Sequence, residues 1–125
     1  MTNKTSAKQV AYLSKHMTYQ SPTSVPLGTM PAGSAILTIN IYPITTFNGT
    51  GTVGMDIGNS EQDNNLVEAA STNLKVGVPL SFAPADSPSI GRFADEATIW
   101  ASVIDQNDNS TAGDCLVVVA FAQDN

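Results

Sequence analysis

The chain has 125 residues, which suits one domain with a hydrophobic core of moderate size. Only 13% of the residues are charged, well below the usual share of about a quarter, and Thr, Ser, Asn and Gly are abundant. This composition favours an all-β protein of a particle or of the extracellular space over a cytosolic helical protein. The net charge of −6 argues against nucleic acid as the main partner, because phosphate binding requires a basic surface.

The N-terminal region differs in charge from the rest of the chain. It contains three of the five basic residues, whereas every acidic residue lies between Asp56 and Asp124. We expect residues 1–20 to form an extended arm before a single β-domain, residues 21–125. The apolar spacing within residues 10–19 also fits an integral strand or a short helix. The arm either docks on a neighbouring protein or remains a solvated terminus. The residues expected to anchor it are Lys4, Lys8, Val10, Tyr12, Leu13, Lys15, Met17 and Tyr19.

The stretch from Pro31 to Asn59 predicts two strands joined by a Gly/Asn-rich connection, following a short strand that begins at Val25. The connection around Asn48 and Gly49 contains residues that tolerate positive φ, so we expect a hairpin. In the first of the two strands, period-two alternation places two sets of residues on opposite faces: Ala35, Leu37, Ile39 and Ile41 on one, and Ile36, Thr38, Asn40 and Tyr42 on the other.

Three further strands follow in the second half of the chain. Residues 74–82 alternate between apolar and polar, and Pro79 marks that strand as an edge or a bulge because proline cannot donate to a ladder. Residues 96–104 form the next strand, with Trp100 on the face opposite its aliphatic residues, and residues 105–113 form a reversal. The chain thus predicts an antiparallel β-sandwich or jelly roll of about seven or eight strands.

The last predicted strand, residues 115–122 (CLVVVAFA), is apolar on both faces. A strand of this kind must be covered on both sides, and a small chain has little material for a second layer. We therefore expect homo-oligomerisation through one of its faces. The residues expected at the subunit interface are Leu116, Val118, Ala120, Tyr42 and Ile44.

No catalytic, zinc or dinucleotide site is predicted. The single histidine, His16, lies in the expected arm and is a poor candidate for the base of a nucleophilic triad. One Cys and one His cannot supply the ligands of a standard zinc site. The letters GTGTVG at residues 49–54 match a dinucleotide motif, but that motif opens a helix and here the run enters a strand. Cys115 is expected to be a small buried hydrophobe.

The loop that begins at Asp105 has part of the pattern of a calcium-binding loop. Asp105, Asn107 and Asn109 have the alternating spacing of oxygen ligands, but Ser110 replaces the glycine of such a loop and Leu116 replaces its bidentate glutamate. A polar turn is the better interpretation, so we predict no metal, no cofactor and no enzymatic activity.

The sequence also bears on where the protein is made. The first seven residues are polar and no apolar segment of a signal peptide follows them, which predicts synthesis in the cytoplasm without general export. No stretch approaches the roughly 18 apolar residues of a membrane span, so no membrane association is expected.

Residues 25–67 (VPLGTMPAGSAILTINIYPITTFNGTGTVGMDIGNSEQDNNLV) resemble a module of virion proteins of tailed bacteriophages. The module has an LG-x-LPAG turn, an apolar strand, T-x-FNG, a strand ending in Gly, and a polar loop. Its later part is similar to residues 98–103 (TIWASV), 111–113 (TAG) and 117–121 (VVVAF), so the resemblance extends over about residues 25–122.

The resemblance implies a non-enzymatic structural protein with a jelly-roll or related β-sandwich fold. Proteins of this kind are often trimeric and serve as capsid decoration (cement) proteins, head fibres or tail-associated parts. The implied function is a trimeric decoration protein that binds the major capsid protein or another virion protein and is located in the virion, after synthesis in the cytoplasm of the host bacterium.

Two alternatives remain from the residues. The first is a receptor- or carbohydrate-binding head of a virion fibre, which needs exposed aromatic residues in loops. The candidates are Phe47, Phe93 and Trp100, with Tyr42 as another aromatic residue for a sugar-stacking platform, although packing is the commoner role of such side chains. The second is an adhesin or pilin-like subunit, which the missing export signal disfavours.

Overall fold

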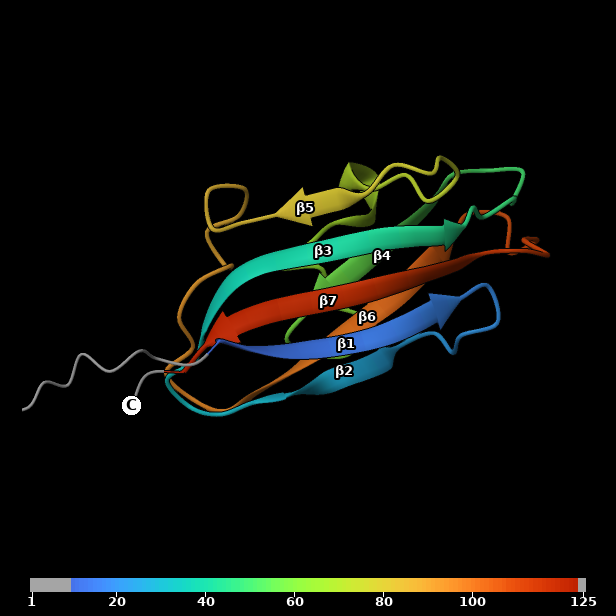
Figure 1. The fold of residues 1–125 in the computed structure, drawn as a ribbon. Coiled ribbons are helices and arrows are strands. Elements are labelled where there is room, and N and C mark those ends of the chain that lie inside the picture. Colours follow the sequence, from blue (N-terminus) through green and yellow to red (C-terminus); the bar gives the residue numbers. More distant parts are fainter. Residues whose placement is uncertain (1–9, 124–125) are drawn as a thin grey trace, which may run out of the picture.

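The computed structural model describes residues 10–123, which form two antiparallel β-sheets packed face to face (Figure 1). Sheet A has the strand order β1-β7-β3-β5, and sheet B has the order β2-β6-β4. The strands are β1 (Val10–Thr18), β2 (Val25–Met30), β3 (Ala35–Thr45), β4 (Val53–Gly58), β5 (Leu80–Phe82), β6 (Ala97–Asp105) and β7 (Asp114–Ala122). The one helical element in this part of the chain is a 3₁₀ turn, η1 (Ala69–Ser71). The predicted antiparallel β-sandwich is confirmed.

Every connection between consecutive strands leads from one sheet to the other, which is the winding of a jelly roll. The predicted hairpin between β3 and β4 is therefore wrong, because β3 lies in sheet A and β4 in sheet B. Their alternating apolar residues face each other across the core instead of lying side by side. Phe47 in the connection is only 3% exposed, and its backbone N–H donates to the carbonyl of Leu74 (2.9 Å).

The predicted faces of β3 are partly wrong, because the strand contains two irregularities in its pairing with β7. The register shifts between Ile36 and Thr38 and again between Pro43 and Thr45, so one residue at each place has no partner opposite. Each shift is a β-bulge, which moves side chains to the other face. Ile36 is buried as a result, and Leu37, predicted to share a face with Ile39 and Ile41, is 41% exposed.

The predicted strand at residues 74–82 is much shorter in the structure. Only β5 is extended and paired, and it pairs with residues 39–41 of β3 at the edge of sheet A. Val76 and Val78 precede it and are 43% and 56% exposed. The edge position that Pro79 predicted is confirmed, but the alternation before it has no neighbouring strand to pair with.

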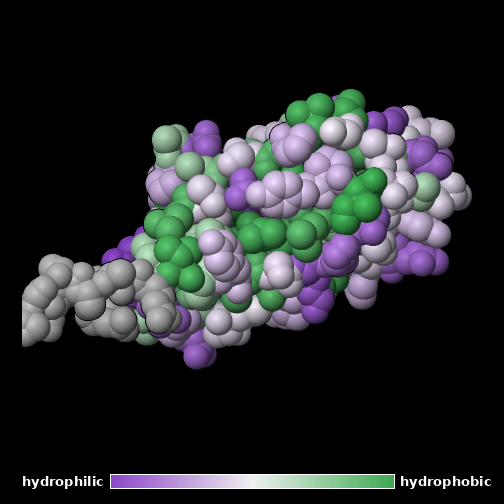
Figure 2. Space-filling model, viewed as in Figure 1, coloured by the Kyte–Doolittle hydropathy of each residue, from purple (hydrophilic) through white to green (hydrophobic). Residues whose placement is uncertain are grey.

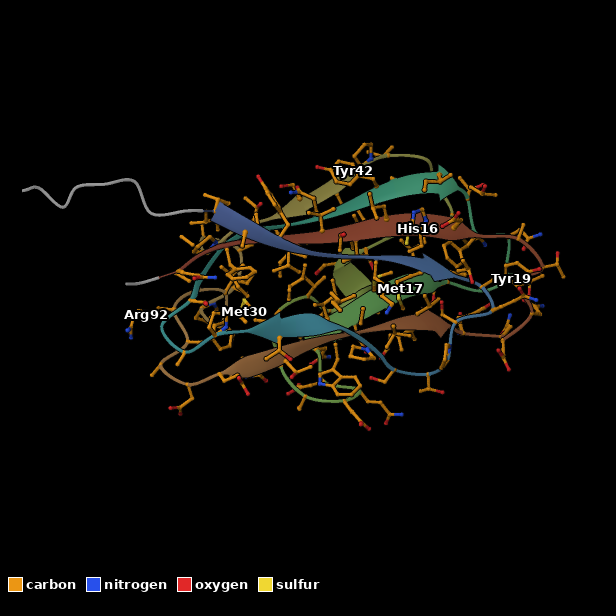
Figure 3. The ribbon with its side chains drawn as sticks, turned by 60° about the horizontal axis from the view of Figure 1, so that its bottom comes forward. His16, Met17, Tyr19, Met30, Tyr42 and Arg92 are labelled. Carbon is orange, nitrogen blue, oxygen red and sulfur yellow. The ribbon has the colours of Figure 1, made fainter. Side chains whose placement is uncertain are left out.

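Residues 10–18, predicted as part of an extended arm, are an integral edge strand. β1 pairs with β7 along its whole length, from Val10 opposite Ala122 to Thr18 opposite Asp114. Met17 is fully buried and lies between the sheets, as Figure 3 shows. The strand alternative for this segment therefore holds. Lys4 and Lys8 lie outside the described residues.

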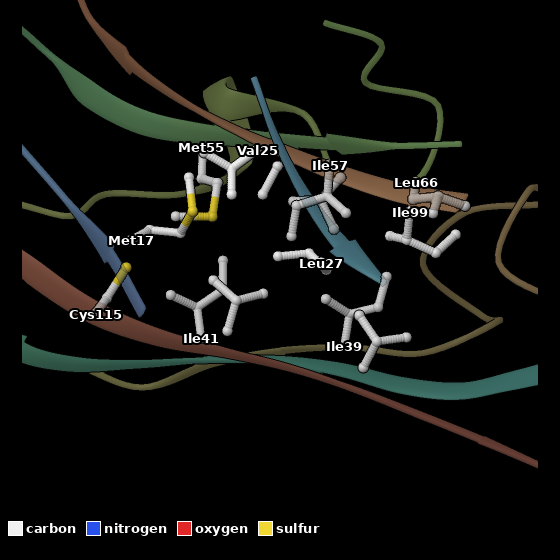
Figure 4. Close-up of a cluster of buried hydrophobic side chains, with 14 of the residues drawn as sticks. Met17, Val25, Leu27, Ile39, Ile41, Met55, Ile57, Leu66, Ile99 and Cys115 are labelled. Carbon is white, nitrogen blue, oxygen red and sulfur yellow. The ribbon is translucent and has the colours of Figure 1, made fainter. Parts of the chain in front are cut away.

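The core fills the space between the two sheets and draws on nearly every strand (Figure 4). Ile39, Ile41 and Val117 of sheet A face Met55, Ile57, Ile99 and Ala101 of sheet B, and all seven are fully buried. Burying a side chain of the Val, Ile or Met class stabilises the fold by about 1.5–3 kcal/mol. Cys115 lies in this core (1% exposed), as predicted.

Candidate assembly surface

The surface with the clearest capacity for assembly is the outer face of sheet A, the side that points away from sheet B. Central strand β7 contributes every second residue to it, between β1 and β3. The strand register sets three rows across this face: His16, Leu116 and Tyr42; Ser14, Val118 and Asn40; and Tyr12, Ala120 and Thr38. The apolar residues of β7 therefore form a stripe that is flanked by polar and aromatic side chains.

The stripe continues into exposed residues at its margins. Tyr12 is 65% exposed, Tyr42 is 43% exposed, and Ile44 at the second bulge of β3 is 57% exposed. In Figure 2, which has the same view as Figure 1, hydrophobic residues form a band across the middle of this face. Three strands about 4.8 Å apart and nine residues of about 3.3 Å give a face of roughly 400 Å². Ser14, His16, Thr38 and Asn40 occupy part of this face, so its apolar area is smaller. Contiguous apolar patches of a few hundred Å² on soluble proteins are often interaction sites.

The outer face of sheet B has a cover that sheet A lacks. Residues 59–73 fold back over β4, where they contact two glycines: a Cβ on Gly54 would overlap the Ala69 carbonyl oxygen, and one on Gly58 would lie 2.7 Å from Asp63. Asp56 and Thr72 hold this cover, by accepting from the Ala69 N–H (2.7 Å) and the Met55 N–H (2.8 Å) respectively. Among the described residues, no such segment lies over sheet A, although neighbouring side chains leave Leu116 and Val118 only partly exposed and Ala120 8% exposed.

All five residues predicted for the subunit interface are brought to this one surface. Leu116, Val118 and Ala120 form the stripe, and Tyr42 and Ile44 lie at its β3 margin. The structure describes a single chain, so their role in an interface stays a prediction. The surface also includes Val10 and Tyr12, which were predicted as arm anchors, because β1 pairs with β7.

The other predicted anchors are dispersed. Leu13 and Met17 face the core, Lys15 is exposed on the edge strand, and Tyr19 is 41% exposed in the turn after β1. The sequence could not show that Tyr12 joins Val118 on one face, since alternation identifies a strand but not its neighbour.

A polar pair lies near one end of the stripe. His16 Nδ1 lies 3.1 Å from Asp114 Oδ1, and both side chains remain partly exposed. His16 is therefore a surface residue of the sheet, in contact with a carboxylate, and no serine or cysteine nucleophile is paired with it among the described residues. The geometry gives it no catalytic arrangement.

The reversal after β6 is a polar turn held by its own side chains. Asn107 Nδ2 and Asn109 Nδ2 each donate to Thr50 Oγ1 (2.9 Å), and Asn109 Oδ1 accepts from the Thr50 N–H (3.0 Å). The amides that spacing suggested as calcium ligands are thus engaged with the neighbouring connection. No group of three or more His, Cys, Asp or Glu side chains within residues 10–123 is placed to hold a metal ion.

Asp105 at the start of this turn has a perturbed carboxyl group. Its Oδ2 accepts from the Ser110 N–H (2.9 Å), whereas Asp105 Oδ1 and Ser110 Oγ are buried without a well-formed hydrogen bond in the described part of the chain. The nearby Ser110 hydroxyl is the main cause that holds the pKa of Asp105 below its ordinary value of 3.8. Desolvation raises the pKa, and backbone N–H groups of the turn lower it again.

No protein-family model matches this chain, and no curated protein sequence matches it closely. Several solved structures do match over nearly the whole chain. A chain of the cyanophage Pam1 capsid asymmetric unit superposes with a TM-score of 0.70 at 11% identity, covering 99% of this chain and 91% of that one. The chain shares that fold.

Two further structures give the same result. A chain from the acidic stable capsid of Helicobacter pylori bacteriophage KHP30 has a TM-score of 0.66 at 12% identity, covering 93% of this chain and 90% of its own. A chain from the capsid of Ralstonia phage GP4 has a TM-score of 0.65 at 16% identity, covering 100% and 92%. Because at least nine-tenths of each neighbour is covered, these are whole chains of nearly the same size.

The described residues contain no helix that is long and apolar enough to cross a membrane.

Proposed function

We propose that the protein is a non-enzymatic structural component of a bacteriophage virion. Two independent lines support this proposal: the sequence resembles virion proteins of tailed phages, and the fold matches whole chains from three phage capsids. The neighbours are small β-sandwich chains of this length, not single domains of longer subunits.

Within the virion, we propose a capsid decoration (cement) role as a homotrimer that binds the major capsid protein or another shell protein. The observation that carries this proposal is the uncovered apolar outer face of sheet A. An area of roughly 400 Å² is about half of the 800 Å² per partner of a standard interface, so the margins at Val10, Leu37 and Ile44 must contribute too. In a trimer the stripe of one copy would contact the β1 or β3 margin of the next around a closed ring, whereas two stripes packed face to face would give a dimer.

The experiment has two parts. Light scattering on the purified protein should give three times the mass of the chain, and a monodisperse monomer at micromolar concentration would contradict the trimer. Co-sedimentation with phage heads that lack the protein should then show saturable binding. Binding to purified tails and not to heads would instead favour a tail-associated component, and failure to bind either would contradict the virion role.

A further inference from the structure

A hollow of about 650 Å³ lies on the opposite side of the molecule, on the outer face of sheet B. The hollow is shallow and open to solvent, and its volume is comparable with the roughly 300–1,000 Å³ of small-molecule sites. Trp100, the only tryptophan in the chain, lines it and is partly exposed. Its neighbours on the adjoining strands are Pro26 and Gly58, and neither carries a long side chain that would lie over the indole. The remaining lining residues are Asn59, Ser60, Glu61, Arg92, Phe93, Ala94, Asp95, Glu96, Ala97 and Thr98.

The polar groups of this hollow supply both acceptors and a donor. The carboxylates of Glu61, Asp95 and Glu96 are exposed, and none has a hydrogen bond or ion pair with another described residue. Asn59 Oδ1 accepts from Asn65 Nδ2 (3.0 Å), which orients the amide of Asn59 and leaves its own Nδ2 without a partner in the same part of the chain. The site therefore holds three acceptor groups, one oriented donor and an aromatic platform.

Both walls of the hollow are held in place by the fold. On one side, Asn59 N–H donates to Asn65 Oδ1 (3.1 Å), and Ser60 Oγ donates to Asp63 Oδ2 (3.1 Å). On the other side, Phe93 and the turn after β2 exchange two backbone hydrogen bonds of 2.8 Å, through Gly33 and Ser34. Preformed walls reduce the entropic cost of binding a small ligand.

We propose that this hollow binds a carbohydrate composed of neutral or amino sugars. The apolar face of a pyranose would stack on the indole of Trp100, and its hydroxyl groups would donate to the carboxylates and accept from Asn59. Three carboxylates against the one guanidinium of Arg92 leave a net charge of −2, which disfavours sialic acids, uronic acids and sulfated sugars. A lysine side chain would use the carboxylates but not the Asn59 donor, so hydroxyl groups fit the site better.

This binding site lies on the sheet opposite to the candidate assembly surface, so the proposal holds whether or not the protein is a decoration protein. A single tryptophan also makes the site directly observable, because all indole fluorescence of the chain comes from Trp100.

The test is a fluorescence titration of the full-length protein with chitotriose and maltotriose, and with 3′-sialyllactose as the anionic comparison. We expect a saturable change in Trp100 emission with at least one neutral trisaccharide at millimolar concentrations, and weaker binding of sialyllactose. The double variant Glu61→Gln, Glu96→Gln should bind at least about tenfold more weakly, because charge-assisted hydrogen bonds are lost. Glu68→Gln, an exposed carboxylate outside the hollow, is the matched control and should bind normally.

Two readouts guard against an effect of the variants on folding. Thermal melting should be unchanged in the Glu61/Glu96 variant, and amide shifts in NMR spectra of the unaltered protein should concentrate at residues 59–61 and 92–100. The proposal is overturned if neither neutral trisaccharide gives a saturable response, if sialyllactose binds more tightly, or if the double variant binds as well as the parent. Binding of trilysine without any sugar response would overturn it too and would assign the hollow to a basic peptide.

Discussion

Val117 and Val118 are adjacent in β7 and point to opposite faces of sheet A, so the same substitution at each separates folding from assembly. Val117 is fully buried between the sheets, and Val118 lies on the outer face, between Ser14 and Asn40. We predict that Val117→Asp prevents folding, and that Val118→Asp leaves a folded monomer that no longer assembles. Both variants change the net charge equally, so charge alone cannot produce a difference between them.

The free-energy cost of Val117→Asp follows from the complete burial of Val117. Removing the valine side chain from the core costs about 1.5–3 kcal/mol. A carboxylate in that position has no cation beside it in the core cluster, and burying an unpaired charge costs several kcal/mol more. The sum is comparable with the total stability of about 5–15 kcal/mol of a domain. We therefore expect Val117→Asp to be unfolded or to accumulate in the insoluble fraction.

The free-energy cost of Val118→Asp differs between the monomer and the assembly. In the monomer the Asp carboxylate can still contact water, so the unfolding free energy should fall by only about 1–2 kcal/mol, from lost strand propensity and partial burial. In an assembly that buries the stripe, each carboxylate loses its water, which costs about 3 kcal/mol or more for each contact. That cost corresponds to at least a hundredfold weaker association.

Light scattering after gel filtration measures the mass, and circular dichroism during heating measures the fold. Ile104→Asp is the control: Ile104 is an exposed aliphatic residue (41%) near the end of β6 in sheet B, whereas Val118 is partly exposed in sheet A. It should remain folded and assemble normally. If Val118→Asp unfolds like Val117→Asp, the assignment of faces is wrong. If it assembles like the parent, the stripe is not the subunit interface.

Three other residues yield predictions of their own. Burial raises the pKa of the Cys115 thiol to about 12, so native protein should resist alkylation at pH 8 until denatured, and rapid native labelling seen by mass spectrometry would contradict its burial. Gly113 has φ +151°, and a Cβ there would overlap the Phe47 ring, so Gly113→Ala should lower the urea-unfolding free energy by about 2 kcal/mol or more. Folding lowers the pKa of Asp105, so its ionised carboxylate stabilises the native state. This stabilisation is fully present above the ordinary pKa of 3.8 and is lost as pH falls through the lower pKa of the folded protein. Asp105→Asn should therefore flatten the dependence of stability on pH below about pH 4, and an unchanged acid limb would refute that contribution.

Much of the fold could be predicted from local patterns. Alternation identified β6, with Ile99 and Ala101 buried and Trp100 on the opposite face. The doubly apolar sequence of β7 belongs to a strand that lies between β1 and β3, where its inner residues fill the core while Leu116 and Val118 form the stripe on the outside. These features depend only on the period of two along a strand, which the sequence displays directly.

The parts that could not be predicted depend on contacts between distant segments. The sequence of residues 31–59 is compatible both with a hairpin and with a connection that crosses between the sheets. The crossing forms because β3 pairs with β7 and β4 pairs with β6. The bulge at Leu37 has no signature in the local sequence, since Ile36 and Leu37 are equally apolar. The hollow at Trp100 was missed for a related reason: Glu61 and Asp95 are 34 positions apart, and the fold brings them to one hollow.

Two deletions in the N-terminal region separate the contribution of β1 from that of the residues before it. Deleting residues 1–20 should prevent folding or lower the unfolding free energy by at least about 3 kcal/mol, because it removes the fully buried Met17 and the whole ladder between β1 and β7. Deleting residues 1–9 leaves β1 intact, so thermal melting should change little. If that shorter deletion still weakens binding to phage heads, the lost affinity belongs to residues 1–9, which contain two lysines and no acidic residue. Raised salt should then weaken binding of the unaltered protein modestly, because it screens the lysine charges. A folded, equally stable protein without residues 1–20 would show that β1 is dispensable and would restore the idea of an arm.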